Sequence, residues 1–235
     1  YEVGDDAAQR KAALEEGLRR LPESDELRLQ LASALTAEKD FVRAQAVVAA
    51  HTRLRDEPAA AELYFDLMRR NEDVAAERRF LALPFADAVA RDESVRERIA
   101  RAREALGELP EAERIFRELL AERPADPERT ADLARILVRR GKAKEARALL
   151  EPLLRAPTPA ILRLAADTAQ AAGDARSAEQ YQLAYLAALG TASAADWSAL
   201  GDIRLSRGDR TGAKRAYAEA LRRLQAQIAS KGASR

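Results

Sequence analysis

Residues 194–224, AADWSALGDIRLSRGDRTGAKRAYAEALRRL, contain two segments with helical spacing of their apolar residues, separated by Gly208. This spacing is typical of amphipathic helices. The positions that define the pattern are Trp197, Leu200, Gly201, Gly208, Ala213, Tyr217 and Ala220. The stretch therefore predicts two helices joined by a tight turn, a unit that must stack on neighbouring units to bury its apolar faces.

The same pattern recurs upstream at intervals of 32 to 36 residues. Equivalent turns are predicted at Lys39, Asn71, Gly107, Gly141 and Gly173. An alanine follows each turn at the same distance in the second helix: Ala44, Ala76, Ala112, Ala146, Ala178 and Ala213. The first helix has a small residue at Ala32, Ala100, Ala134, Ala166 and Gly201, with Tyr64 in that place in the second full repeat. Small side chains at these positions allow the paired helices to approach closely.

These features resemble the tetratricopeptide repeat, a helix–turn–helix unit with a period of about 34 residues. The resemblance implies an all-α fold, a right-handed α-solenoid of about six repeats after an N-terminal half-repeat. We expect a single solenoid over residues 1–235, with the half-repeat at 5–22 and repeats at 24–55, 57–91, 92–123, 126–156, 159–189 and 194–227. Pro84 predicts an interruption of the second helix of repeat 57–91. Because the chain opens with half a repeat and with Tyr1, we also expect it to be part of a longer array.

The composition argues against several classes of function. Charged residues make up 34% of the chain, yet the net charge is +1, which disfavours nucleic acid or an anionic membrane as the main partner. The sequence has no cysteine and a single histidine, His51, for which we expect a structural role. It also lacks the glycine-rich nucleotide-binding and hydrolase motifs. We therefore predict a non-enzymatic protein with no catalytic residue, metal site or cofactor.

The resemblance implies a binding groove, because the first helices of tetratricopeptide repeats line a concave surface that commonly receives a peptide or a partner helix. The residues predicted for this groove are Phe65, Met68, Arg101, Arg135, Arg139, Arg163, Asp167 and Asp202. Its basic centre is expected to favour an acidic segment of a partner protein, because the arginine fork suits carboxylates. The alternative is that the arginines only pair with nearby carboxylates, as the spacings Glu97/Arg101 and Asp132/Arg135 suggest.

The leading interpretation is a scaffold that binds another protein. Degenerate arrays rich in alanine and arginine are similar to the periplasmic repeat regions of bacterial exopolysaccharide export proteins, in particular the Pel type. That resemblance implies a periplasmic location and recruitment of a polysaccharide-modifying enzyme to an outer-membrane complex of biofilm formation. The alternative is a cytoplasmic regulatory or assembly module that binds an acidic peptide segment. Direct polysaccharide binding is a third interpretation, supported in the groove by Phe65 alone.

Overall fold

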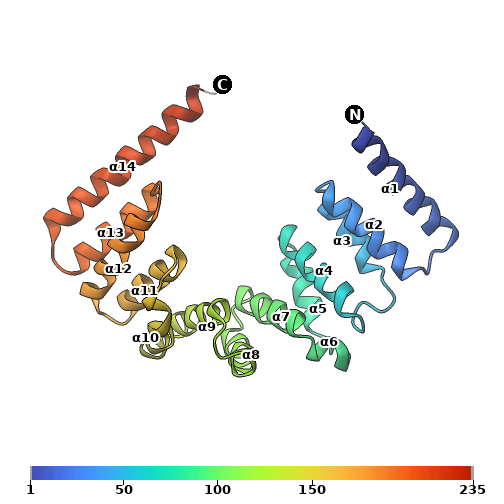
Figure 1. Cartoon of the computed structure of the whole chain (residues 1–235), viewed down its shortest axis with the longest axis horizontal. Helices are drawn as coiled ribbons and strands as arrows, with labels where there is room; N and C mark the ends of the chain where they lie inside the picture. Colours follow the sequence, from blue (N-terminus) through green and yellow to red (C-terminus); the bar gives the residue numbers. More distant parts are fainter. Residues whose placement is uncertain (1, 234–235) are drawn as a thin grey trace. The chain divides into compact units, whose positions relative to one another are not determined.

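The computed structural model describes residues 2–233, and every regular element in that range is a helix. The all-α fold is therefore confirmed. The chain divides into two compact units, unit 1 at Tyr1–Ile115 and unit 2 at Phe116–Arg235 (Figure 1). Within the described range, no helix has both the length and the apolar composition needed to cross a bilayer. Residues 1, 234 and 235 of the predicted solenoid lie outside the described range, and its continuity across both units stays a prediction.

Unit 1 consists of helices that pack on their neighbours in the chain. They are α1 Glu2–Arg20, α2 Asp25–Ala37, α3 Phe41–Ala49, α4 Pro58–Arg70, α5 Val74–Leu81, α6 Asp87–Arg91 and α7 Glu93–Ala105. Helix α2 packs on α1 and α3, and α4 packs on α3, α5 and α7. Helix α8, Leu109–Glu122, crosses the limit between the units.

Unit 2 has the same hairpin organisation. Its helices are α9 Pro127–Arg139, α10 Ala143–Leu150, the 3-10 helix η1 Glu151–Arg155, α11 Pro159–Ala171, α12 Ala175–Ala188, α13 Ala194–Ser206 and α14 Arg210–Ala233. The pairs α9/α10, α11/α12 and α13/α14 are the hairpins, and α11 packs on both α9 and α10. Each hairpin thus covers the apolar face of the one before it, as stacked repeats require.

Local chemistry explains where the helices begin. A side-chain oxygen accepts a hydrogen bond from a first-turn amide at Ser24, Asp40, Asp73, Asp92, Asp126, Thr158, Asp174 and Ser193. Such caps satisfy amide groups that have no partner within the helix. Ser193 and Asp196 form a reciprocal capping box at the start of α13. Proline occupies the first helical position of α4, α9 and α11, where its missing amide costs nothing.

The turns set the register of the repeats and correct one of the predicted positions. A left-handed residue ends the first helix at Lys39, Glu72, Gly107, Gly141, Gly173 and Gly208. After it, the next amide donates to the carbonyl five residues back, for example Asp73 to Met68 and Glu108 to Arg103, each at 2.8 Å. The turn of repeat 57–91 is therefore centred on Glu72 and not on Asn71. The predicted turn lay one residue too early in the chain. Because successive helical residues are about 100° apart around the axis, this error assigned every side chain of the repeat to the wrong helix face.

The corrected register changes which residues of this repeat occupy the tightly packed positions. In the first helix the small-residue position belongs to Phe65 and not to Tyr64. In the second helix it belongs to Glu77 and not to Ala76. The equivalent alanines of the other repeats are almost completely buried. Repeat 57–91 thus places a ring and a carboxylate where the other repeats place small side chains.

Phe65 belongs to an aromatic cluster in unit 1. The rings of Tyr64, Phe65 and Phe85 lie with their centroids 4.9, 5.0 and 5.1 Å from that of Phe80. Helix α5 ends at Leu81 and α6 begins at Asp87, so the interruption predicted from Pro84 is confirmed. Arg55 holds the connecting segment by donating to backbone carbonyls of Phe80, Leu83 and Pro84.

Asp25 ties the start of α2 to the chain after α3. Its carboxylate accepts hydrogen bonds from the amide and hydroxyl of Thr52 and from Arg28, and His51 Nδ1 lies 3.5 Å away. Burial acts to raise the pKa of Asp25, but these hydrogen bonds outweigh it and bring the pKa from 3.8 to about 2. Because the folded-state pKa lies below the unfolded one, the stabilisation is present above pH 4 and is lost as the pH falls towards 2.

We expect Asp25→Asn to lower the free energy of unfolding at pH 7 by about 1 kcal/mol, since a charge-assisted network becomes a neutral one. The gap between wild type and variant should narrow as the pH falls from 4 to 2. Urea unfolding at a series of pH values measures this gap. Asp56→Asn, at an exposed aspartate, is the control and should leave the pH profile unchanged. If the difference in unfolding free energy between wild type and Asp25→Asn stayed constant down to pH 2, the lowered pKa of Asp25 would be contradicted.

Candidate functional site

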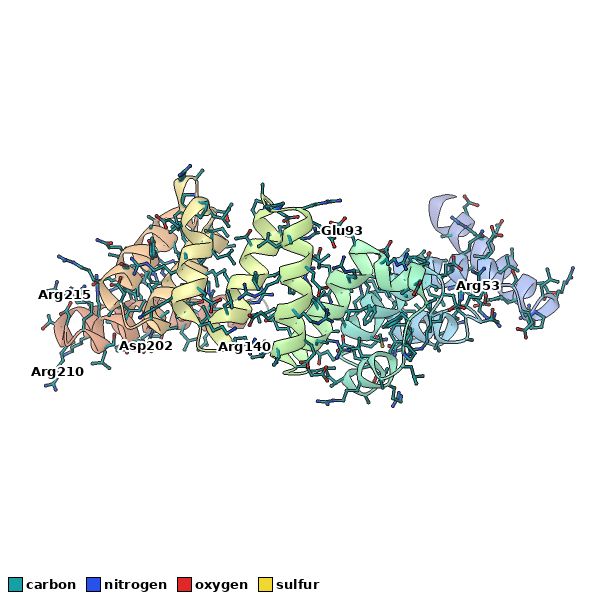
Figure 2. All side chains as sticks on the ribbon, turned by 90° about the horizontal axis from the view of Figure 1, so that it is seen from below. Arg53, Glu93, Arg140, Asp202, Arg210 and Arg215 are labelled. Carbon is teal, nitrogen blue, oxygen red and sulfur yellow. The ribbon has the colours of Figure 1, made fainter. Side chains whose placement is uncertain are left out.

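The predicted groove residues fall in two sets. Phe65, Met68 and Arg101 belong to unit 1, and the other five belong to unit 2. The side chains of both units are drawn in Figure 2. All eight lie on first helices of hairpins: α4, α7, α9, α11 and α13.

The structure corrects the placement of Phe65 and Met68, which are 3% and 0% exposed. They face the core instead of an open groove, because the turn of their repeat is centred on Glu72. With the corrected turn, the groove positions that the prediction had given to Phe65 and Met68 belong to Asp66 and Arg69. Phe65 and Met68 nevertheless line a hollow between α4, α5 and α7.

This hollow, which we call the α4–α7 hollow, has a volume of about 330 Å³. Apolar side chains supply most of its surface, and charged side chains complete it. Its lining residues are Phe65, Asp66, Met68, Arg69, Glu72, Asp73, Val74, Glu77, Arg98, Arg101, Ala102 and Ala105. Of the predicted groove residues, the hollow therefore brings together the three of unit 1.

Ion pairs engage the arginines around the hollow. Arg98 contacts Glu62 at 2.6 Å and Asp66 at 3.2 Å. Arg101 pairs with Glu97 at 2.6 Å, as their spacing in the sequence predicted. Arg69 lies 3.5 Å from Asp66. The guanidinium groups of the hollow are thus already neutralised by neighbouring carboxylates.

Glu77 is the exception among the charged groups of the hollow. It is 8% exposed, and within residues 2–233 its carboxylate takes part in no hydrogen bond and no ion pair. Burial raises the pKa of Glu77, and the nearby Arg69 only partly opposes this shift. Sequence reasoning missed Glu77, because only first helices were considered for the groove. The signal that could have found it is a charged residue at the small-residue position of a repeat.

A larger hollow of about 500 Å³ lies beside His51 and is also lined by Arg55, Tyr64 and Phe80. The guanidinium of Arg55 is bonded to backbone carbonyls and lies 4.6 Å from the centre of the Phe80 ring. The His51 side chain is fully buried, and its Nδ1 accepts the amide of Arg53 at 3.1 Å. His51 Nε2 is buried without a hydrogen bond, 3.4 Å from a carboxylate oxygen of Glu57. The structural role expected for His51 stays a prediction.

In unit 2 the five predicted residues are all exposed at the surface. Arg135 and Arg139 lie on α9, Arg163 and Asp167 on α11, and Asp202 on α13. Helix α9 packs on α11, and Arg163 reaches Asp196 of α13 at 3.4 Å, so the three first helices are neighbours. We call this set the α9–α13 surface.

The α9–α13 surface combines ion pairs with accessible charge. Arg135 is 44% exposed and pairs with Asp132 at 2.7 Å, as the alternative interpretation expected. The Arg163 side chain is 57% exposed and makes only long contacts, to Asp196 and at 3.5 Å to the Tyr185 hydroxyl. Asp202 accepts a hydrogen bond from Tyr217 at 2.6 Å. Each guanidinium has five donors, so one such contact leaves others for a ligand.

Behind this surface, Asp196 organises a buried network. Burial acts to raise its pKa, but hydrogen bonds from the Ser193 hydroxyl and amide and from Tyr185 overcome this effect and lower it. Gln182 donates to the Asp196 backbone carbonyl at 2.8 Å. The network fixes α12 against α13 and positions Arg163. Among the described residues, no group of three histidine or acidic side chains is placed to hold a metal ion.

Comparison with known proteins shows which fold the helical hairpins of this chain have. Residues 103–167 match the tetratricopeptide repeat family. The chain has a tetratricopeptide-repeat fold. A tetratricopeptide repeat protein from Parabacteroides merdae is similar with a TM-score of 0.66 and 13% identity, covering 95% of this chain and 89% of that one. No curated protein matches the chain.

Other solved tetratricopeptide structures are also similar. MamA from Desulfovibrio magneticus RS-1, from residue 41 to its end, gives a TM-score of 0.55 at 12% identity, covering 86% of this chain and 96% of that one. A chain of the APC/C hetero-tetramer Cut9–Hcn1 gives 0.54 at 16% identity, covering 94% of this chain and 42% of that one. At these identities the likeness concerns the fold.

Proposed function

We propose that this tetratricopeptide-repeat chain is a non-enzymatic scaffold that binds another protein, and that the α9–α13 surface of unit 2 docks a carboxylate-bearing segment of that partner. The observation that carries the proposal is the exposure of Arg135, Arg139 and Arg163 on neighbouring first helices. Arginine at such a surface offers planar, charge-assisted hydrogen bonds to a carboxylate.

The ion pairs within this surface are compatible with docking. The carboxylates of Asp132 and Asp196 are buried, whereas the guanidinium groups of their partners Arg135 and Arg163 are exposed. A guanidinium has further donors that face solvent, so it can bind a partner carboxylate and keep its ion pair. Arg163 supports the same view, because its two contacts, at 3.4 and 3.5 Å, are at the long end for hydrogen bonds. Asp167 of α11 and Asp202 of α13 would repel acidic groups on the side of the surface away from α9.

A role in exopolysaccharide export, a periplasmic location and recruitment of a polysaccharide-modifying enzyme stay predictions from the sequence resemblance, as does the cytoplasmic alternative. The similar structures named above are other tetratricopeptide proteins. Direct polysaccharide binding loses its one supporting residue, because Phe65 is buried.

We expect the double substitution Arg135→Glu and Arg139→Glu to weaken binding of the partner protein at least about tenfold, since attraction becomes repulsion at two positions. A partner is identified by affinity capture with the wild-type chain and mass spectrometry. Its affinity for both forms is then measured by calorimetry with purified components. Thermal unfolding is measured in parallel, because Arg135→Glu removes an ion-pair partner of the buried Asp132 and is expected to lower the melting temperature.

The matched control is Arg210→Glu with Arg215→Glu on α14, which makes the same change of charge elsewhere on unit 2. Figure 2 shows both residues at the end of the unit, well apart from Arg140, the neighbour of Arg139 in the chain. Both are exposed. Equal weakening by the two double variants would indicate a non-specific effect of net charge, and unchanged binding by the first would refute the proposed surface.

A further inference from the structure

Glu77 stands where the other five full repeats have alanine. Counted from the capping residue of each second helix, its equivalents are Ala44, Ala112, Ala146, Ala178 and Ala213. These alanines are at most 2% exposed and pack against the paired helix. At this position a carboxylate replaces a methyl group in repeat 57–91, and the α4–α7 hollow lies beside it.

The burial of Glu77 is costly to the folded protein. A carboxylate taken out of water without compensating hydrogen bonds loses its solvation. Its position in the first turn of α5 offsets part of this loss, because the helix dipole favours negative charge there by about 0.3–1 kcal/mol. No hydrogen bond to the carboxylate accompanies this dipole within the described residues. An uncompensated buried acid that lines a hollow is a recognised mark of a binding site.

The hollow combines a negative end with apolar walls. Val74 and Ala105 supply exposed apolar surface beside Glu77, and the buried Phe65, Met68 and Ala102 complete the lining. Its charged lining consists of four carboxylates, Asp66, Glu72, Asp73 and Glu77, and three guanidinium groups, Arg69, Arg98 and Arg101.

The uncompensated charge of the hollow is therefore negative. The three arginines are engaged by Asp66, Glu62 and Glu97, as described above. Charge complementarity consequently favours a cation as the occupant.

We propose that the α4–α7 hollow accepts a lysine side chain of a partner protein, with the ammonium group on the Glu77 carboxylate and the methylene stem against the exposed apolar side chains of Val74 and Ala105. Lysine suits this site better than arginine, because its compact charge on a flexible apolar stem needs one carboxylate at the end of an apolar passage. The inference rests on the proposed function only in taking the occupant to be part of a protein. Its chemistry is opposite to that of the α9–α13 surface.

Met68 provides a direct probe, because it is the only methionine in the sequence and lines the hollow. With a ¹³C-labelled methionine methyl group, its NMR signal can be followed during titration with the peptide acetyl-Ala-Leu-Lys-Leu-Ala-amide. We expect a saturable shift of this signal with a Kd in the millimolar range. The same peptide with norleucine in place of lysine keeps the stem and lacks the charge, and should bind at least tenfold more weakly.

The decisive variant is Glu77→Gln, which keeps the shape and removes the charge. It should reduce the affinity for the lysine peptide to that for the norleucine peptide. Its melting temperature should equal or exceed that of the wild type, because an uncompensated buried charge is removed. Glu23→Gln, at an exposed carboxylate of unit 1 that does not line the hollow, is the matched control and should bind the lysine peptide like the wild type.

The affinity should also depend on pH with a defined sign. The charged groups that line the hollow with Glu77 are Asp66 and Arg69 of α4, Glu72 and Asp73 of the turn, and Arg98 and Arg101 of α7. Because burial raises the pKa of Glu77, protonation removes the charge at a higher pH than for an ordinary glutamate. The lysine peptide should therefore bind more weakly as the pH falls, while binding of the norleucine peptide stays constant.

Three results would overturn the inference: no saturable shift with the lysine peptide, equal affinity for the norleucine peptide, or unchanged lysine affinity in Glu77→Gln. A marked loss of thermal stability in Glu77→Gln would also overturn it, by showing that the carboxylate is structural. Failure of the proposed function is distinguishable. If the lysine peptide does not bind but Arg135→Glu with Arg139→Glu still weakens partner binding, the inference alone falls. If the lysine peptide binds as expected but Arg135→Glu with Arg139→Glu leaves partner binding unchanged, only the proposed α9–α13 docking surface is refuted.

Discussion

Replacing Phe80 by alanine is expected to lower the free energy of unfolding by about 3–5 kcal/mol, the usual cost of truncating a buried aromatic residue. Phe80 is 5% exposed and lies at the centre of the aromatic cluster, in edge contact with Tyr64, Phe65 and Phe85. The guanidinium of Arg55 lies over the Phe80 ring and donates a hydrogen bond to the backbone carbonyl of Leu83, in the segment after α5. The substitution therefore removes apolar burial, ring contacts and the support of that segment together.

Urea unfolding followed by circular dichroism measures the loss, and hydrogen exchange locates it in α4 and α5. Leu83→Ala is the control, because Leu83 lies in the same segment but is 59% exposed. It should change the free energy of unfolding by about 0.5 kcal/mol or less. A loss below about 1 kcal/mol in Phe80→Ala would show that the cluster does not hold this part of unit 1 together.

Gly201→Ala is expected to destabilise the protein by about 1–3 kcal/mol, although alanine is the better helix former by about 1 kcal/mol. A methyl group at Gly201 would lie 2.4 Å from Cε1 and 2.6 Å from Cδ1 of the Tyr217 ring. These distances are far below van der Waals contact, so either the ring or α14 must move. Tyr217 is also held in place by its hydrogen bond to Asp202. Thermal unfolding of the purified variant measures the effect.

Gly17→Ala makes the same change in another helix and serves as the control. There the added methyl group meets only the flexible end of Leu27, at 3.1 Å. We expect a stability within about 1 kcal/mol of the wild type, because helix propensity and mild crowding oppose each other. If Gly201→Ala were as stable as Gly17→Ala, close packing of α13 on α14 would not depend on the glycine.

Much of the candidate site followed from local spacing. The pairs Glu97/Arg101 and Asp132/Arg135 were expected because residues three or four apart on a helix are neighbours, and both ion pairs are present. The partners of Arg163 and Arg98 were not foreseen. Asp196 is 33 residues from Arg163 and Asp66 is 32 residues from Arg98, so the stacking of hairpins decides these contacts.

The errors concentrate in repeat 57–91, and one cause explains them. Four of the six turns have a glycine with positive φ, which marks the register in the sequence. In this repeat the left-handed residue is Glu72, next to Asn71, a residue type that also tolerates this conformation. The sequence offered two adjacent candidates for one turn. Choosing Asn71 assigned the core residues Phe65 and Met68 to the groove and gave Ala76 the position that Glu77 occupies.

The sequence by itself determined the helical hairpins and the position of every turn that contains glycine, because these depend on interactions within a few residues. Only the tertiary structure decided the register of repeat 57–91, the burial of Phe65 and the isolation of Glu77. These depend on which faces of neighbouring hairpins meet. A shift of one residue turns a helix face by about 100°, a difference that packing against α7 distinguishes and that composition and spacing do not.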